Sequence, residues 1–211
     1  AVTTPLIKKA DGTKFGKTES GNVWLDAEKT SPYEFYQFWL NASDTDAENY
    51  IKIFTLMTRE EIEALISKHN EAPHQRALQK ALAEDITTRV HGKDALQTAI
   101  VVTNLLFGKA SHEDVVSMSV NDFEGMKGAV DVATISKDEF GSGIGILDAL
   151  SGKTGFLKSN GEARTAAKQN AVSVNKEKVD DRFSITSETL IHDKYVLLSK
   201  GKKNNYLLIV E

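Results

Sequence analysis

Two lysines three residues apart, Lys14 and Lys17, have a spacing that suggests phosphate binding. They lie in the segment DGTKFGKT, residues 11–18. Glycines such as Gly16 let the backbone fold closely, so both ammonium groups can contact one polyphosphate, and the Thr18 hydroxyl can donate to it. The alternative is a solvated basic turn.

The segment does not match a phosphate-binding P-loop. Only three residues separate Gly12 from Gly16, whereas the P-loop pattern needs four. Polar residues follow at 19–22, where a P-loop would lead straight into a helix. A second Gly-Lys-Thr, at 152–154, has Leu147 in place of the first glycine. We therefore predict a loop that holds phosphate through its lysines.

A second group of cations surrounds a predicted helix over 161–170, which Ser159 and Asn160 can cap. The helix start would offer free N–H groups to a phosphate. Charge and shape recognise structured RNA, and the basic residues near this helix or on the turn before the last strand are Lys158, Arg164, Lys168, Lys202 and Lys203. The alternative is an ordinary solvated helix face.

The charge distribution favours a polyanion-binding end. Residues 153–211 contain eleven Lys or Arg and seven Asp or Glu, whereas residues 1–152 contain fifteen and twenty-three. The absence of cysteine excludes disulfides and Cys-type zinc sites and fits a reducing cytoplasm. The five histidines form no ligand pattern, so we predict no metal site. No apolar run suggests a membrane span.

The elements fall into two groups. Capping boxes at Ser31–Glu34 and Thr58–Glu61 and apolar residues at helical spacing predict four or five helices over 31–108. Pro73 should open one of them, and Gly92 should close it as a left-handed cap. Aromatic residues 33–39 should pack in the core. Residues 109–143 look like a connecting segment with a strand near 126–132. A short helix, a longer helix, a strand and a hairpin over 195–210 should follow.

One long stretch resembles a known family. PLIKKADGTKFGKTESGNVWLD and EKTSPYEFYQFWLNASDTD resemble the signature loop and the following helical entry of bacterial tyrosyl-tRNA synthetases, which are class I aminoacyl-tRNA synthetases. The resemblance implies that Lys14, Gly16, Lys17 and Thr18 bind ATP. It also implies that both lysines stabilise the triphosphate while the tyrosine carboxylate attacks the α-phosphate. Mg²⁺ would accompany ATP, and no tightly bound cofactor is expected.

The C-terminal segments FLKSNGEAR and AKQNAVSVN resemble an S4-type RNA-binding module. Lys176 replaces the usual glycine of that pattern, and Thr165 stands where a second arginine is frequent. The resemblance implies tRNA(Tyr) contacts at Lys158, Ser159 and Arg164. In the helical part, Asp44 or Asp46 is our candidate anticodon contact, since a carboxylate accepts from base N–H groups; a helix cap is the alternative.

The predicted fold is a mainly α-helical anticodon-binding domain followed by a small α+β S4-like domain. We divide the chain into 1–29, the end of a catalytic domain; 30–110, the anticodon-binding domain; 111–143, a linker; and 144–211, the S4-like domain. No H-I-G-H-like motif or βαβ series occurs. We therefore expect a C-terminal portion, inactive alone, of a cytoplasmic ligase.

The complete protein would bind ATP, tyrosine and tRNA(Tyr) and would form a homodimer through the domain not included. The competing hypothesis is a free-standing, non-catalytic RNA-binding protein built on an S4-type module. The phosphate-binding loop favours the ligase, because a pure RNA binder has no use for it.

Overall fold

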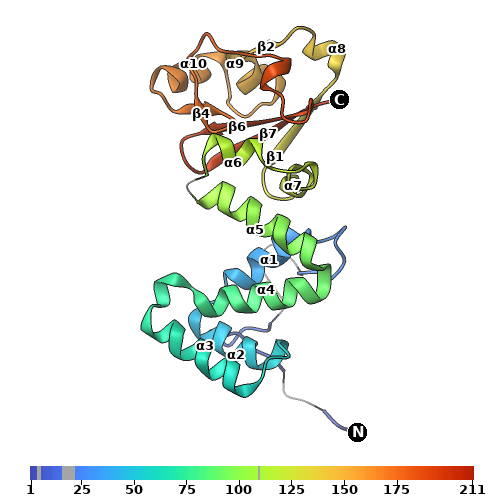
Figure 1. Cartoon of the computed structure of the whole chain (residues 1–211), viewed down its shortest axis with the longest axis vertical. Coiled ribbons are helices and arrows are strands. Elements are labelled where there is room, and N and C mark those ends of the chain that lie inside the picture. The colour runs from blue at the N-terminus through green and yellow to red at the C-terminus, as the bar shows by residue number, and fades with distance from the viewer. Residues whose placement is uncertain (4–5, 16–21, 109) are drawn as a thin grey trace. The chain divides into compact units, whose positions relative to one another are not determined.

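A computed structural model describes residues 1–3, 6–15, 22–108 and 110–211. The chain divides into two compact units, residues 1–99 and 100–211, and the boundary lies within helix α5 (Lys93–Phe107) (Figure 1). None of the helices in these ranges is both long enough and apolar enough to span a bilayer.

The first unit is helical. It contains α1 (Pro32–Leu40), α2 (Asp44–Phe54), α3 (Arg59–Glu71), the 3₁₀ turn η1 (Pro73–Gln75) and α4 (Ala77–His91). Both predicted capping boxes are confirmed: Ser31 and Glu34 exchange side-chain and backbone hydrogen bonds at the start of α1, and Thr58 and Glu61 do so at α3.

The start of α4 differs from the prediction. Pro73 begins only the turn η1, and Arg76 then adopts a left-handed conformation with φ 54° before α4 begins at Ala77. At this break the Arg76 guanidinium donates to the carbonyl oxygens of Leu40, the last residue of α1, and of Ala42. Gly92 ends α4 as expected and has a positive φ of 88°, but its ψ of 169° differs from that of the predicted left-handed cap.

The second unit is built on a five-stranded mixed sheet. Its strands are β1 (Asp131–Ile135), β3 (Val172–Val174), β4 (Glu177–Lys178), β6 (Tyr195–Lys200) and β7 (Asn204–Val210), in the order β1-β7-β6-β3-β4. Only β1 pairs in parallel, with β7. The predicted hairpin over 195–210 is confirmed as β6–β7. A separate antiparallel pair joins β2 (Ile144–Gly145) to β5 (Ser184–Ile185).

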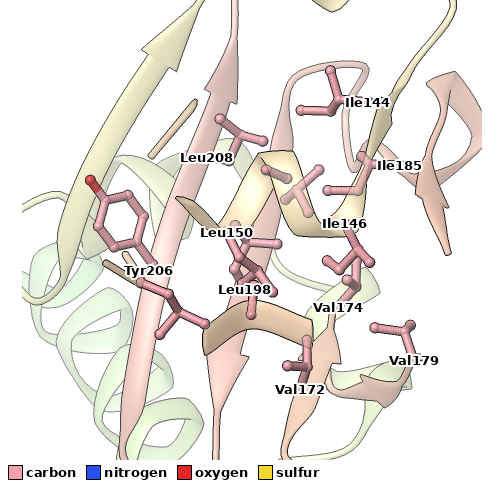
Figure 2. Packing of buried hydrophobic residues seen from close by; sticks show 14 of the residues in the cluster. Ile144, Ile146, Leu150, Val172, Val174, Val179, Ile185, Leu198, Tyr206 and Leu208 are labelled. Carbon is pink, nitrogen blue, oxygen red and sulfur yellow. The ribbon is translucent and has the colours of Figure 1, made fainter. Parts of the chain in front are cut away.

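One face of the sheet packs on short helices. These are α9 (Ile146–Asp148), the π-helical turn η2 (Ala149–Lys153) and α10 (Asn160–Lys168). Figure 2 shows Ile146 and Leu150 packed against Val172, Val174 and Leu198 of the sheet, and all five side chains are buried.

Alternate residues of β6 are buried on the other face, where Tyr195 stacks on Phe123 of α7 (Val120–Met126) with ring centroids 4.7 Å apart. The remaining short helices are α6 (His112–Val116), α8 (Lys137–Phe140) and the 3₁₀ turn η3 (Ser187–Thr189).

The predicted connecting segment 111–143 belongs to this unit. The strand expected near 126–132 is displaced, because α7 runs to Met126 and β1 begins only at Asp131. β1 adds to the open edge of β7, with Ile135 opposite Val210, and α7 covers the second face. β6 and β7 are buried at nearly every position, so both faces of these strands are covered, and residues 111–143 contribute the cover of the second face.

Candidate phosphate-binding hairpin and basic surface

Residues 7–15 form a small hairpin that presents Lys14. Lys8 and Lys14 form an antiparallel bridge, and Phe15 N donates to Ile7 O at 3.1 Å. The turn closes through Lys9 N to Thr13 O at 2.8 Å, and Gly12 occupies its left-handed position with φ 84°.

The Asp11 carboxylate braces this turn. Its Oδ1 accepts from both the hydroxyl and the amide of Thr13, at 2.6 and 2.9 Å. These bonds, the hydroxyl bond first, lower the pKa of Asp11. The Lys14 side chain is exposed beside the turn. The other three predicted ATP ligands, Gly16, Lys17 and Thr18, lie outside the described residues.

Asp46 attaches the hairpin to α2. Its buried side chain accepts from Ala10 N at 2.7 Å through Oδ1 and from the Ser43 hydroxyl at 2.7 Å through Oδ2. Ser43 in turn caps α2 by accepting from Asp46 N at 3.1 Å. Both carboxylate oxygens are therefore engaged within the first unit.

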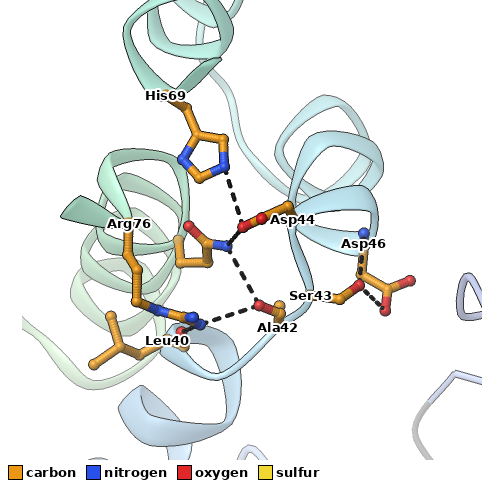
Figure 3. A network of polar contacts seen from close by, with 8 residues as sticks. Leu40, Ala42, Ser43, Asp44, Asp46, His69 and Arg76 are labelled. Atoms are coloured by element: carbon orange, nitrogen blue, oxygen red, sulfur yellow. Dashed lines mark hydrogen bonds and ion pairs between the residues drawn. The ribbon is translucent and has the colours of Figure 1, made fainter. Parts of the chain in front are cut away.

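Asp44 has a different environment from Asp46, and Figure 3 shows the two carboxylates pointing to opposite sides of the first turn of α2. The Asp44 side chain is 61% exposed, with Oδ1 2.6 Å from Gln79 Nε2 and 3.1 Å from His69 Nε2. The Gln79 hydrogen bond is the main cause of a lowered pKa at Asp44. Asp44 is thus an exposed carboxylate whose orientation is fixed by contacts with Gln79 of α4 and His69 of α3.

The helix predicted over 161–170 is α10, and the cations expected near it lie on α10 or next to it in the sequence. Ser159, and not Asn160, is the N-cap, and it accepts from Glu162 N at 3.2 Å. The helix ends at Lys168, two residues earlier than predicted. The side chains of Lys158, Arg164 and Lys168 are exposed, and Arg164 Nε lies 3.9 Å from Asp181 Oδ2.

An open groove of about 700 Å³ brings some of these cations together. Of the predicted residues, Lys158 and Lys203 line it, whereas Arg164, Lys168 and Lys202 do not. Lys127 and Lys200, which the motifs did not single out, line it as well. Lys200 Nζ lies 2.7 Å from Glu162 Oε1, and this contact is the main cause of a lowered pKa at Glu162.

Comparison with known proteins identifies the family. The model described as "tRNA synthetases class I (W and Y)" matches residues 1–108, half of the chain. The chain belongs to this family. The model described as "Tyrosine--tRNA ligase SYY-like C-terminal domain" matches residues 124–209. The synthetase family model thus extends over the hairpin and all helices of the first unit, so the matched part is not confined to C-terminal modules.

Several relatives of this class I tRNA synthetase chain are tyrosine–tRNA ligases. The ligase of Flavobacterium psychrophilum is 52% identical over 211 residues, that of Flavobacterium johnsoniae 52% over 210, and that of Porphyromonas gingivalis 48% over 212. Each match covers 100% of this chain and 49% of the relative. The chain therefore spans about half the length of these curated relatives.

Among the described residues, no group of three or more His, Asp or Glu could hold a metal ion.

Proposed function

We propose that this chain is part of a tyrosine–tRNA ligase, which joins tyrosine to tRNA(Tyr) through tyrosyl-adenylate. The observation that supports this most is a match along the whole chain, at 52% identity, to ligases of that name. The reaction consumes ATP: the tyrosine carboxylate attacks the α-phosphate, pyrophosphate leaves, and the tRNA terminal hydroxyl then displaces AMP.

Lys14, Gly16, Lys17 and Thr18 form the ATP-binding loop in this proposal. The two ammonium groups hold the triphosphate and offset the charge that develops as pyrophosphate leaves. The exposure of Lys14 on a braced hairpin supports this role, because a clamping cation must be accessible to its ligand. Mg²⁺ bound to the phosphates of ATP would share the charge.

The two units bind tRNA(Tyr). Within residues 30–110, Asp44 contacts the anticodon; its exposed, hydrogen-bonded carboxylate supports this choice over Asp46, which is buried. Residues 144–211 act as an S4-like module, whose sheet is completed by β1 from residues 111–143. The module holds RNA phosphates through Lys158, Ser159, Arg164, Lys168, Lys202 and Lys203. The complete protein acts in the cytoplasm as a homodimer.

The decisive measurement is tyrosine-dependent ATP–pyrophosphate exchange by the complete gene product. Lys17→Ala should slow tyrosine activation by about 10²–10³-fold, as expected when one preorganised charge partner is removed. Lys14→Ala should act in the same direction. Tyrosine affinity should change little, because both lysines act on phosphate. A loss of tyrosine affinity with an unchanged activation rate would contradict these roles.

Pyrophosphate exchange and tRNA charging by the complete gene product also distinguish the two candidate functions. A ligase supports exchange and charges tRNA(Tyr) with tyrosine. A free-standing RNA-binding protein with an S4-type module would bind tRNA(Tyr) but show no exchange above the blank, and that result would overturn the proposal.

A further inference from the structure

Phe15, the residue after Lys14, is part of an aromatic cluster. Its ring centroid lies 5.0 Å from Tyr50, 5.0 Å from Phe54, 5.6 Å from Trp39 and 5.9 Å from Phe38. These four rings come from α1 and α2, and Trp39 and Tyr50 are buried. One aromatic side chain therefore fixes the second strand of the hairpin to two helices.

A second contact fixes the turn of the same hairpin. The buried Asp46 carboxylate accepts from Ala10 N at 2.7 Å, in addition to its bond with the Ser43 hydroxyl. Charged acceptors make stronger hydrogen bonds than neutral ones. The two contacts lie five residues apart in the chain and differ in chemistry, since one is an aromatic packing contact and the other a hydrogen bond to a charged carboxylate.

These contacts determine where Lys14 points. Successive side chains of an extended backbone project to opposite sides. Packing of the half-buried Phe15 against the helices therefore turns the neighbouring Lys14 towards solvent, in agreement with the exposure of the Lys14 side chain. The Lys8–Lys14 bridge holds the two sides of the hairpin together, and the Ala10 contact gives the hairpin a second attachment to α2, which opposes its rotation about the Phe15 ring.

We propose that Phe15 and Asp46 are positioning residues for tyrosine activation: they hold the hairpin on α1 and α2 so that Lys14 meets the triphosphate in a fixed geometry. This inference rests on the proposed role of Lys14 as an ATP ligand. Neither residue touches the substrate. Their effect follows from geometry, because a displacement of about 1 Å in a catalytic group can cost on the order of 10²-fold in rate.

The test uses Phe15→Leu in the complete protein, with Phe35→Leu as a matched control. Phe35 is buried next to Trp39, with ring centroids 6.1 Å apart, but it makes no ring contact with Phe15 among the described residues. Phe15→Leu should lower kcat for pyrophosphate exchange or raise KM for ATP by about 10-fold, below the roughly 10²-fold limit of such effects. KM for tyrosine should stay unchanged.

Phe35→Leu should lower the thermal stability of the protein and leave exchange intact at a temperature where both variants are folded. The second comparison is Asp46→Ala with Ser43→Ala. Both disturb the start of α2, but only Asp46→Ala releases Ala10 N. Asp46→Ala should therefore reproduce the ATP-specific defect of Phe15→Leu, whereas Ser43→Ala should not.

Lys14→Ala separates failure of this inference from failure of the proposed function. If Lys14→Ala leaves exchange unchanged, the ATP-binding role is wrong. If Lys14→Ala slows exchange while Phe15→Leu and Asp46→Ala behave like their controls, only the positioning role is overturned. If both roles hold, the Lys14→Ala/Phe15→Leu double variant should be little slower than Lys14→Ala alone, because residues acting through one group are not additive.

Discussion

At the residue scale, the two acidic side chains at the start of α2 have different environments. Asp44 and Asp46 are two positions apart in the sequence and equivalent as candidate base contacts. In the structure Asp46 is buried against Ala10 and Ser43, whereas Asp44 is exposed and oriented by Gln79. Burial and partners, which depend on other helices, distinguish them.

Asp44→Ala should reduce discrimination between tRNA(Tyr) and anticodon variants of it. A well-oriented side chain contributes about 1–3 kcal/mol of discrimination per base, so the ratio of aminoacylation efficiencies should fall by about 5–150-fold. The lowered pKa of Asp44 keeps it ionised, as an acceptor, at neutral pH. Glu48→Gln is the control, because Glu48 lies on the same helix and pairs with Lys52. Equal ratios in wild type and Asp44→Ala would contradict the assignment.

Glu124 should make the second unit sensitive to acid. Its carboxylate lies 2.6 Å from Lys127 Nζ and accepts from the Tyr195 hydroxyl, and these contacts, Lys127 first, lower the pKa of Glu124. A lowered folded-state pKa gives stability that is present above the unfolded value of about 4.3 and is lost as pH falls through the folded value.

Hydrogen exchange of the β6–β7 amides between about pH 5 and pH 3 should therefore show a steeper loss of stability in wild type than in Glu124→Gln. Intrinsic exchange rates, which also change with pH, are corrected for in both proteins. Parallel pH profiles would mean that the Glu124 contacts contribute nothing in the folded state.

At the scale of single elements, the turn between β3 and β4 carries an unusual residue. Asn175 and Lys176 have φ values of 47° and 68°, and Val174 pairs with Glu177 across them. Two consecutive positive φ values define a type I′ turn, which favours glycine at its second position. Asn175 suits the turn and is also held by Leu197 N and Thr189 O through its side chain.

Lys176→Gly should raise the free energy of unfolding of the second unit by about 0.5–1 kcal/mol, because glycine adopts positive φ without steric cost. The half-buried ammonium adds to the expected gain, since burial lowers the pKa of Lys176. Lys178→Gly on the adjacent strand is the control and should lower stability. Chemical denaturation of both variants measures the difference. The Lys176 ammonium donates to Asn205 Oδ1 at 3.2 Å, and a loss of stability in Lys176→Gly would show that this hydrogen bond outweighs the backbone strain.

Arg164 of α10 should contribute more to RNA binding than Lys203 of the β6–β7 turn. A guanidinium can hold a phosphate with two hydrogen bonds, whereas Lys203 lies exposed on the β6–β7 turn. Each lost phosphate contact should flatten the log–log salt dependence of tRNA binding by roughly 0.7–0.9. The titration needs the whole chain, because a piece beginning at residue 144 would lose β1 from the sheet. Lys137→Ala is the control, and an unchanged slope for Arg164→Ala would exclude a phosphate contact there.

At the scale of the whole molecule, the 211-residue chain should bind tRNA(Tyr) without forming tyrosyl-adenylate. The described residues of the first unit contain helices and one hairpin bridge but no strand. Such a unit can present a cation to ATP but cannot position both tyrosine and ATP for attack. Pyrophosphate exchange by the 211-residue chain, beside the complete protein, tests this. Turnover well above the blank would mean that the chain builds a full active site.

The sequence alone determined the features that depend on neighbours a few residues away. The capping boxes of α1 and α3 and the β6–β7 hairpin are local, since their partners lie within a few positions or one turn.

Only the tertiary structure decided the rest. Asp46 meets Ala10 across 36 positions, and β1 pairs with β7 across about 75, contacts that no periodicity predicts. The groove that joins Lys127 and Lys200 to Lys158 and Lys203 has the same origin. Packing selects such distant pairs because buried polar groups and open strand edges must find partners, and the choice depends on the whole fold.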